Sequence, residues 1–298
     1  MRIAIIGKFQ RLYDEEYIAR SFEMLGHDVL RVPDNCSFIA IFNRFDEFQP
    51  HICIFTKYEP TERFAMFQQQ LRLRKIKSIC WIFDLYWEYP REYRITTAPF
   101  FKADIVVTTD GGHDDKWRSV GIKHYCVRQG IYREECKMLD PGGLKQRNGV
   151  IFIGSHNGWN EERIQTIQKI SDYFGDRFKW YGKKNTHEVR GMALNALYAQ
   201  PKTVVIGDSV WSPHYWSNRV VETLGRGGFL IHVEVPGLKE EYPDLVTYTR
   251  GDVAELIEKI KHYLNKDEER EAIRQKNYEL VKNNYTMDKK CEELLNLL

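Results

Sequence analysis

The pattern that most constrains the fold is a series of short apolar runs alternating with helical segments, which occurs twice along the chain. Arg2–Gly7 opens the first series and Val150–Ser155 opens the second. Short apolar strands that alternate with helices are typical of parallel α/β sheets, whose strands are buried on both faces. The sequence therefore predicts two Rossmann-like halves that face each other across a cleft, with ligands at the carboxyl ends of the strands.

The same periodicity sets the expected elements. Further strands are expected at Asp28–Val32, His51–Thr56, Ser78–Phe83, Asp104–Thr108, His124–Arg128, Phe178–Tyr181, Thr203–Ile206 and Phe229–His232. Helices are expected through Tyr17, Phe22 and Leu25 and at Thr61–Lys77, Glu161–Phe174, Val189–Ala199, Arg219–Gly225, Asp252–Leu264, Lys266–Asn284 and Met287–Leu298.

The pattern weakens at Arg133–Asn148, which contains Pro141-Gly142-Gly143 and several charges and is typical of a linker. We therefore expect a first domain at 1–140 and a second domain at 149–284. A last helix at 285–298, rich in leucine, is expected to cross back and pack on the first domain.

Composition narrows the class of protein. A chain of 298 residues is long enough for two domains with separate cores. No apolar stretch approaches the roughly 18 residues of a membrane span, and the N-terminus is typical of a first strand rather than a signal peptide. The six cysteines include no C-x-x-C pair, which indicates reduced thiols and a cytoplasmic protein. The 44 basic and 42 acidic residues neither require nor exclude a polyanionic partner.

The segment Tyr215–Ile231 joins a polar stretch to a short helix, a Gly-Gly turn and an apolar strand. Ser217, Asn218 and Arg219 are expected at the helix start, where free N–H groups attract anions, and Glu222 follows one turn later. This combination suits a nucleoside diphosphate with its ribose. The alternative is a capped helix with a solvated Glu222, but a carboxylate beside an apolar strand needs donors, which two ribose hydroxyls would supply.

Other polar or glycine residues follow expected strands and are weaker candidates. Each has an ordinary alternative as a tight turn or a helix cap. Neither the turn at Gly7 nor the turn at Gly154 matches the dinucleotide-binding motif G-x-G-x-x-G. On the ligand side they are Gly154, Ser155, Tyr181, Gly182, Asp208 and Ser209, and Gly7 and Lys8 follow the first strand.

The second half of the chain resembles a known protein family. The segments Tyr198–Ser209 and Ser217–Phe229, continued by Pro236–Glu240, Gly251–Leu256 and Asp267–Glu271, resemble the nucleotide-sugar-binding half of GT-B glycosyltransferases. The likeness covers residues 150–298 and is closest to the family 1/4-like group with the CgeB-type proteins. It implies transfer of a sugar from a UDP- or GDP-linked donor, with no other cofactor.

The resemblance also implies roles for single residues. Glu222 matches the glutamate that binds ribose, and Ser217, Asn218 and Arg219 would lie near the diphosphate, with Gly154 and Ser155 closing over it. Retaining members often carry a first glutamate eight positions before the ribose glutamate, and here that position is His214. Retention and inversion therefore both stay open.

The first half must supply the acceptor side. Asp84, which follows a strand amid aromatic residues, is a candidate general base, and His113, within Asp110-Gly-Gly-His113, could assist it. Gln129 ends another strand and could touch the donor. The alternatives are a structural loop aspartate and a capping or loop histidine.

No metal signature of the D-x-D, H-E-x-x-H or paired-cysteine type occurs, so we expect metal-independent transfer, with Arg219 and backbone N–H groups stabilising the leaving group. The densest basic cluster comprises Arg63, Arg72, Arg74, Lys75 and Lys77, which is either a solvated helix surface or a strip for the phosphates of a DNA acceptor. A glycan, a small molecule and a hydroxymethylated DNA base all remain possible acceptors. The rival functions are a non-catalytic nucleotide-sugar-binding protein and a nucleotide-sugar epimerase.

Overall fold

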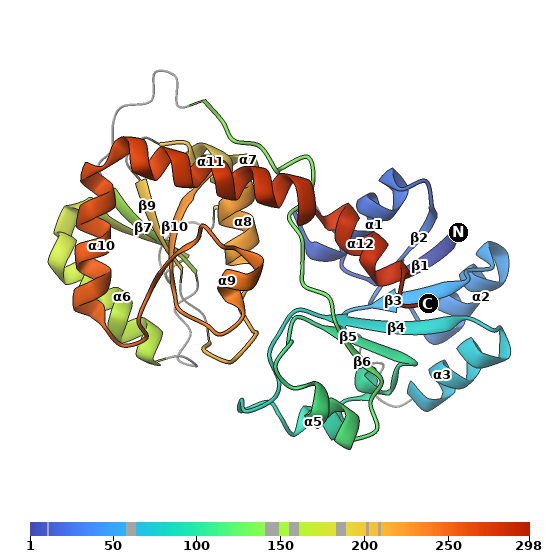
Figure 1. Cartoon of the computed structure of the whole chain (residues 1–298). Coiled ribbons are helices and arrows are strands. Elements are labelled where there is room, and N and C mark those ends of the chain that lie inside the picture. The colour runs from blue at the N-terminus through green and yellow to red at the C-terminus, as the bar shows by residue number, and fades with distance from the viewer. Residues whose placement is uncertain are drawn as a thin grey trace. The chain divides into compact units, whose positions relative to one another are not determined.

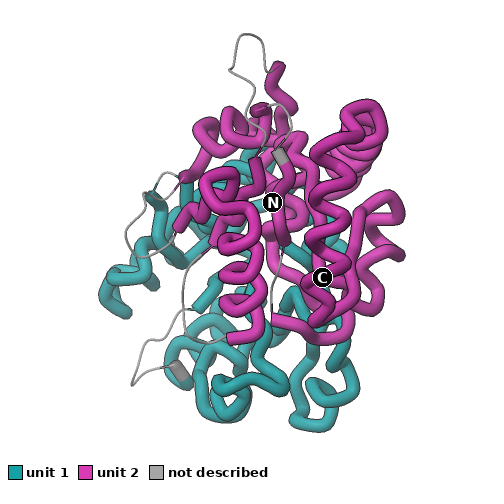
Figure 2. Tube along the Cα trace, turned by 90° about the vertical axis from the view of Figure 1, so that its left-hand side faces the viewer, with its two compact units in different colours: residues 1–129, 287–298 teal, residues 130–286 magenta. Residues whose placement is uncertain are grey.

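The chain divides into two compact units, shown in different colours in Figure 2. Unit 1 comprises Met1–Gln129 and Met287–Leu298, and unit 2 comprises Gly130–Thr286. The computed structural model describes residues 1–10, 12–57, 64–140, 149–154, 161–182, 189–200, 203–207 and 210–298. Within these ranges, no helix is both long and apolar enough to cross a membrane.

Unit 1 is built on a parallel sheet whose strand order is β2-β1-β3-β4-β5-β6. Successive side chains of a strand point to opposite faces, and β1 shows this directly: Ile3 and Ile5 enter one buried cluster, whereas Ala4 and Ile6 enter the other. The strands are β1 (Arg2–Gly7), β2 (Asp28–Pro33), β3 (Ile52–Phe55), β4 (Lys77–Ile82), β5 (Ile105–Thr108) and β6 (His124–Cys126). The helices are α1 (Asp14–Met24), α2 (Phe38–Phe48), α3 (Phe64–Leu73), α4 (Arg94–Thr97), α5 (Asp114–Ser119) and α12 (Met287–Leu295), with a 3-10 turn at Pro99–Lys102.

Helix α12 is far from unit 1 in the sequence and yet part of its core. Met287, Cys291 and Leu294 recur at helical spacing and are buried with Ile18 and Phe22 of α1, beside which α12 lies in Figure 1. The last helix therefore completes the core on one face of the first sheet.

Unit 2 is built on a second parallel sheet, with strand order β11-β10-β9-β7-β8. One cluster of buried apolar side chains, which includes Phe152, Val205 and Ile231, fills its core. The strands are β7 (Gly149–Ile153), β8 (Phe178–Tyr181), β9 (Thr203–Gly207), β10 (Phe229–Val233) and β11 (Val246–Tyr248). The helices are α6 (Glu161–Phe174), α7 (Met192–Tyr198), α8 (Arg219–Gly225), α9 (Leu238–Glu241), α10 (Val253–Asn265) and α11 (Asp267–Asn284), with a 3-10 turn at Gly175–Arg177.

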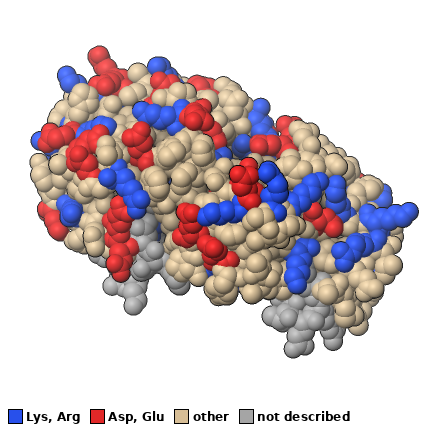
Figure 3. All heavy atoms as spheres, turned by 60° about the horizontal axis from the view of Figure 1, so that its bottom comes forward, with Lys and Arg blue, Asp and Glu red and all other residues tan. Residues whose placement is uncertain are grey.

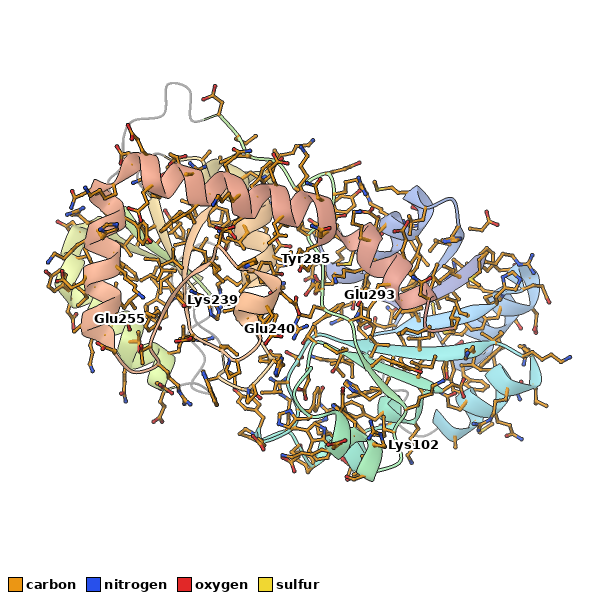
Figure 4. The ribbon with its side chains drawn as sticks, in the orientation of Figure 1. Lys102, Lys239, Glu240, Glu255, Tyr285 and Glu293 are labelled. Carbon is orange, nitrogen blue, oxygen red and sulfur yellow. The ribbon has the colours of Figure 1, made fainter. Side chains whose placement is uncertain are left out.

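The chain passes between the units at two points that lie next to each other in unit 2. The Ile131 N–H donates to the Tyr285 carbonyl at 3.1 Å, and Ile131 forms a parallel bridge with Thr286. Tyr285, labelled in Figure 4, packs against Tyr242 with ring centres 5.1 Å apart and ring planes tilted by 31°. Residues 130–140, which we expected in the first domain, cluster with unit 2 because Ile131 and Cys136 are buried in its core.

The prediction of two parallel α/β halves is confirmed, and most expected strands agree with the observed ones within one or two residues. The helix expected at Thr61–Lys77 is described from Phe64 and ends at Leu73, because Lys75 has a left-handed φ of 57°. Helix α2, with Ser37 accepting a hydrogen bond from the Ala40 N–H at 3.3 Å, was not predicted, and neither was β11. The expected cap Thr61 lies outside the described residues.

Candidate functional site

Three predicted ligand-side residues meet at the carboxyl ends of β7 and β8. The Gly154 N–H donates to the Tyr181 carbonyl at 2.9 Å, and the Trp180 indole N–H donates to the Gly154 carbonyl at 2.9 Å. Gly182 has a φ of +84°, and a Cβ there would lie 3.0 Å from the Gly154 carbonyl oxygen. Because β8 and β9 flank β7 on opposite sides, these residues lie beside the point where the strand order reverses, the usual ligand position in such sheets.

Arg219, the first residue of α8, reaches the same place. Its Nε donates to the Ile153 carbonyl at 2.6 Å, and its guanidinium lies 5.2 Å from the centre of the Phe152 ring. A Cβ at Gly154 would lie 2.7 Å from Arg219 Nη2, so a glycine leaves room for the guanidinium. Ser217 Oγ accepts a long bond of 3.4 Å from Arg219 Nη1, and Asn218 occupies the N-cap position without a side-chain cap bond.

Glu222 lies one turn after Arg219 on α8, with its side chain 20% exposed. Its Oε2 accepts two hydrogen bonds from Arg226, from Nε at 2.9 Å and from Nη2 at 2.6 Å. Within the described part of the chain, no group donates to its Oε1. We expected two ribose hydroxyls to supply the donors that this carboxylate needs; in the structure, Arg226 supplies those of one oxygen.

Arg226 itself was not predicted to matter. It is 2% exposed and also contacts Glu135 and Asn195, which are buried too. Burial alone would lower the pKa of Arg226, but the neighbouring carboxylates of Glu222 and Glu135 outweigh burial and raise it well above its ordinary value. The i,i+4 spacing of Glu222 and Arg226 was a visible signal, whereas the contact with Glu135 spans 91 positions and left no local pattern.

His214, at the position where retaining relatives carry a glutamate, has a left-handed φ of 52°. Its N–H donates to the Pro236 carbonyl at 2.9 Å, and a Cβ at Gly237 would overlap its ring. His214 is therefore packed against the turn that follows β10. The candidates Ser155, Asp208 and Ser209 lie outside the described residues.

His232 is a fully buried histidine on β10, beside Gly207 at the end of β9. Its Nδ1 donates to the Val233 carbonyl at 2.7 Å, and its buried Nε2 has no hydrogen-bond partner among the residues that the structure describes. Burial lowers the pKa of His232 to about 4, because the charged imidazolium would be removed from water.

We expect this residue to make stability depend on pH. The unfolded chain binds a proton at His232 below its ordinary pKa of 6.5, whereas the folded protein does so only near pH 4. Its contribution is therefore complete above pH 6.5 and is lost as the pH falls towards 4, at about 1.4 kcal/mol per pH unit. Urea denaturation at several pH values checks this. His232→Phe should flatten the slope relative to the unmodified protein, and an unchanged slope would contradict the assignment.

In unit 1, Asp84 follows β4 and is one third exposed. It forms ion pairs with Lys57 and with Arg91, the latter at 3.3 Å. Arg91 also lies over the rings of Tyr86 and Tyr89, at 5.3 and 5.0 Å from their centres. Two cations thus already engage the Asp84 carboxylate.

His113 and Asp110 form a buried pair after β5, the neighbour of β4. Both Asp110 oxygens lie within hydrogen-bond distance of His113 Nδ1, at 2.9 and 3.0 Å, and Asp110 is fully buried. A carboxylate only accepts, so Nδ1 is the nitrogen that donates to Asp110. His113 occupies the N-cap position of α5 but its side chain caps nothing; Nε2 instead lies 3.6 Å from Glu88 Oε2.

The remaining unit 1 candidates have separate surroundings. A Cβ at Gly7 would overlap the side chain of Glu15, whose Oε1 accepts from Thr56 Oγ1 at 2.8 Å. Gly7 is therefore required for a close approach at the end of β1. Lys8 is exposed, and Gln129 Nε2 donates to Asp14 Oδ1 at 2.6 Å within unit 1.

The predicted basic cluster is partly used within unit 1. Arg74 pairs with Asp46 at 2.6 Å, and Lys77 Nζ donates to the Leu298 carbonyl at 3.2 Å, while Arg63 lies outside the described residues. Figure 3 shows acidic and basic side chains interspersed over much of one face, with basic ones predominating towards its right-hand end. Among the described residues, no group of three or more His, Cys, Asp or Glu side chains is placed to hold a metal ion.

Three solved structures illustrate what the whole chain is similar to. Sucrose-phosphate synthase from Thermosynechococcus elongatus aligns with a TM-score of 0.64 at 13% identity, covering 99% of this chain and 98% of that one. The DNA-modifying enzyme β-glucosyltransferase aligns at 0.61 and 13%, covering 100% and 98%. UDP-GlcNAc 2-epimerase from Methanocaldococcus jannaschii aligns at 0.55 and 11%, covering 100% and 99%. At such identities the likeness shows the fold, which is that of GT-B glycosyltransferases.

A comparison with curated protein sequences gives no significant match. The model of one protein family, described as glycosyl transferase-like, matches residues 137–296, which is more than half of the chain. This range contains Gly154, Arg219, Glu222 and Arg226. The chain belongs to the glycosyl transferase-like family.

Proposed function

We propose that the protein transfers a sugar from a nucleoside-diphosphate sugar to an acceptor hydroxyl without a metal ion. The donor binds to unit 2 and the acceptor to unit 1. The observation that carries the proposal is Arg219 beside Gly154, at the strand-order reversal of the second sheet, with Glu222 one turn later on the same helix. Membership of the family and the GT-B fold support the same reaction.

Each of these residues has a distinct task. The Arg219 guanidinium, for which Gly154 leaves room, neutralises charge on the donor diphosphate as the nucleotide leaves. Glu222 Oε1 accepts from a ribose hydroxyl. A UDP- or GDP-linked sugar is the expected donor.

On the acceptor side, the Asp110–His113 pair is the better arranged base. His113 Nε2 accepts the proton of the acceptor hydroxyl, while Asp110 holds the ring and stabilises the imidazolium that forms. Asp84, with its two cations, is better suited to orienting the acceptor. A glycan, a small molecule or a hydroxymethylated DNA base can supply the hydroxyl; β-glucosyltransferase, which shares the fold, is a DNA-modifying enzyme.

The direct test is a thermal-shift screen with UDP-, GDP- and ADP-linked sugars, since a ligand that binds only the folded state raises the Tm. Release of the nucleotide is then followed with and without acceptor. A transferase releases it faster with acceptor, a binding protein does not release it, and an epimerase converts the sugar with no acceptor. A shift with none of the donors would contradict the proposal.

Glu222→Ala is expected to weaken donor binding by about ten- to a hundredfold, because a hydrogen bond to a charged group contributes roughly 1.5–3 kcal/mol. Isothermal titration with the best nucleotide measures this. Glu258→Ala, which removes a glutamate with 69% side-chain exposure on α10, is the matched control and should bind normally. Normal binding by Glu222→Ala with an intact fold would exclude the ribose assignment.

A further inference from the structure

We propose that Arg226 and Glu135 are positioning residues that hold Glu222 so that a single oxygen, Oε1, is presented to the ribose. The proposal rests on the function proposed above. It assigns a role to Glu135, which lies near the start of unit 2 and is not itself proposed to contact the ligand. Three features of the described residues carry it: the use of every Arg226 donor, the anchoring of Glu135, and the packing beneath α8.

The Arg226 guanidinium has five N–H groups, and each has an acceptor. Nε and one N–H of Nη2 donate to Glu222 Oε2, and the other N–H of Nη2 donates to Glu135 Oε2. Nη1 donates to the Gly191 carbonyl at 3.2 Å and to Asn195 Oδ1 at 2.5 Å. A guanidinium bound on all sides is fixed in position, and so is the carboxylate oxygen that it holds.

Asn195 connects this group to the backbone. Its Nδ2 donates to the carbonyls of Glu135, at 2.8 Å, and Lys137, at 2.7 Å, while its Oδ1 accepts from Arg226. Both N–H donors and the oxygen of this fully buried amide are therefore used, between α7, the end of α8 and the 135–137 segment. Glu135 is held through its main chain and its side chain at once.

Glycines let α8 approach this segment closely. A Cβ at Gly225 would lie 2.9 Å from side-chain atoms of Ile131 and Val281, and one at Gly227 would lie 2.5 Å from Met138 Cγ. Gly227 also has a φ of +72°. The end of α8 therefore packs closely against Ile131 and Met138, which lie on either side of Glu135 in the sequence. This packing leaves Glu222 little freedom to shift along the helix axis.

The consequence concerns selectivity for the ribose. Glu222 Oε2 already accepts two bonds, so its rotamer is set before a ligand arrives, and the ordering cost of binding is reduced. Only Oε1 can accept from a hydroxyl. Loss of Glu135 or of the Arg226 guanidinium should let this carboxylate move. The preference for a nucleotide with ribose hydroxyls over one without them should then decrease.

The experiment uses the full chain and compares two probes by titration. One is whichever of UDP, GDP and ADP the unmodified protein binds best, and the other is its 2′,3′-dideoxy counterpart. The unmodified protein should prefer the ribose form by about ten- to a hundredfold. In Glu135→Gln and Arg226→Lys, affinity for the ribose form should fall while that for the dideoxy form stays, so the preference shrinks to about threefold or less.

Arg270→Lys is the matched control, since Arg270 is 3% exposed in unit 2 and pairs with Asp267 rather than Glu222. It should keep the full preference even if its Tm falls. A preserved preference in Glu135→Gln and Arg226→Lys, or an equal loss of affinity for both probes, would overturn the positioning role. If the unmodified protein binds no nucleotide, or shows no preference, the proposed function or the role of Glu222 itself has failed.

Discussion

His113→Ala is expected to lower the turnover of the nucleotide-sugar donor by about 10²- to 10⁴-fold, the usual contribution of a positioned general base. The reason is the geometry of the Asp110–His113 pair, in which a buried carboxylate accepts from Nδ1 and holds the ring, so that Nε2 is the nitrogen proposed to take the proton. Release of the nucleotide, with water or an added alcohol as acceptor, measures the effect. Nucleotide affinity should be unchanged, because the residues assigned to the nucleotide lie in unit 2.

Two companion variants separate the alternatives. Asp110→Asn keeps the size of the side chain but can donate to Nδ1, which favours the wrong tautomer, so its turnover should fall in a similar way. Asp84→Asn should affect mainly the KM for the acceptor, since Asp84 is held by Lys57 and Arg91. Near-normal turnover in His113→Ala together with inactive Asp84→Asn would transfer the role of base to Asp84.

Arg226→Met is expected to destabilise unit 2 by about 3–5 kcal/mol, because removal of one partner from a buried ion pair leaves uncompensated charge. Here two carboxylates, Glu135 and Glu222, would face each other without the cation that lies between them. Asn195 would also lose the donor to its oxygen. Chemical denaturation, monitored by fluorescence, gives the change in the free energy of unfolding.

The control for this variant is Arg250→Met, in the same unit. Arg250 pairs with Glu162 at 2.6 Å, but both side chains are about half exposed, so the loss should not exceed about 1 kcal/mol. A similar small effect of Arg226→Met would mean that the buried network contributes little to folding. It would also remove the physical basis for a fixed Glu222.

Much of the fold follows from the sequence because its signals are local. Apolar runs such as Arg2–Gly7 and Phe229–His232 are short and bounded by turns, so their strands are recognisable. Glu222 follows Arg219 by three positions, and any α-helix brings residues at this spacing to the same side. Helix α2 was not predicted, although Ser37 caps its first turn.

The supporting residues of the site were harder to predict. Glu135 meets Arg226 across 91 positions of sequence, and nothing in the composition of the 130–140 segment distinguishes a buried carboxylate from a solvated linker residue. Tertiary packing alone makes the contact. The Asp110–His113 pair differs from the Glu135–Arg226 contact because the two residues are only three positions apart, in a turn after a strand. That spacing can be seen in the sequence, whereas the burial of the pair cannot.

The way the chain returns to unit 1 decides how the protein can be divided for study. Unit 2 is one uninterrupted stretch, Gly130–Thr286, so a single fragment would contain the whole of its buried network. Unit 1 cannot be obtained by truncation after Gln129, because its core would lose Met287, Cys291 and Leu294 and expose the apolar side chains of α1. Joining residues 287–298 ahead of Met1 in a permuted gene would restore that helix and make each unit a continuous polypeptide.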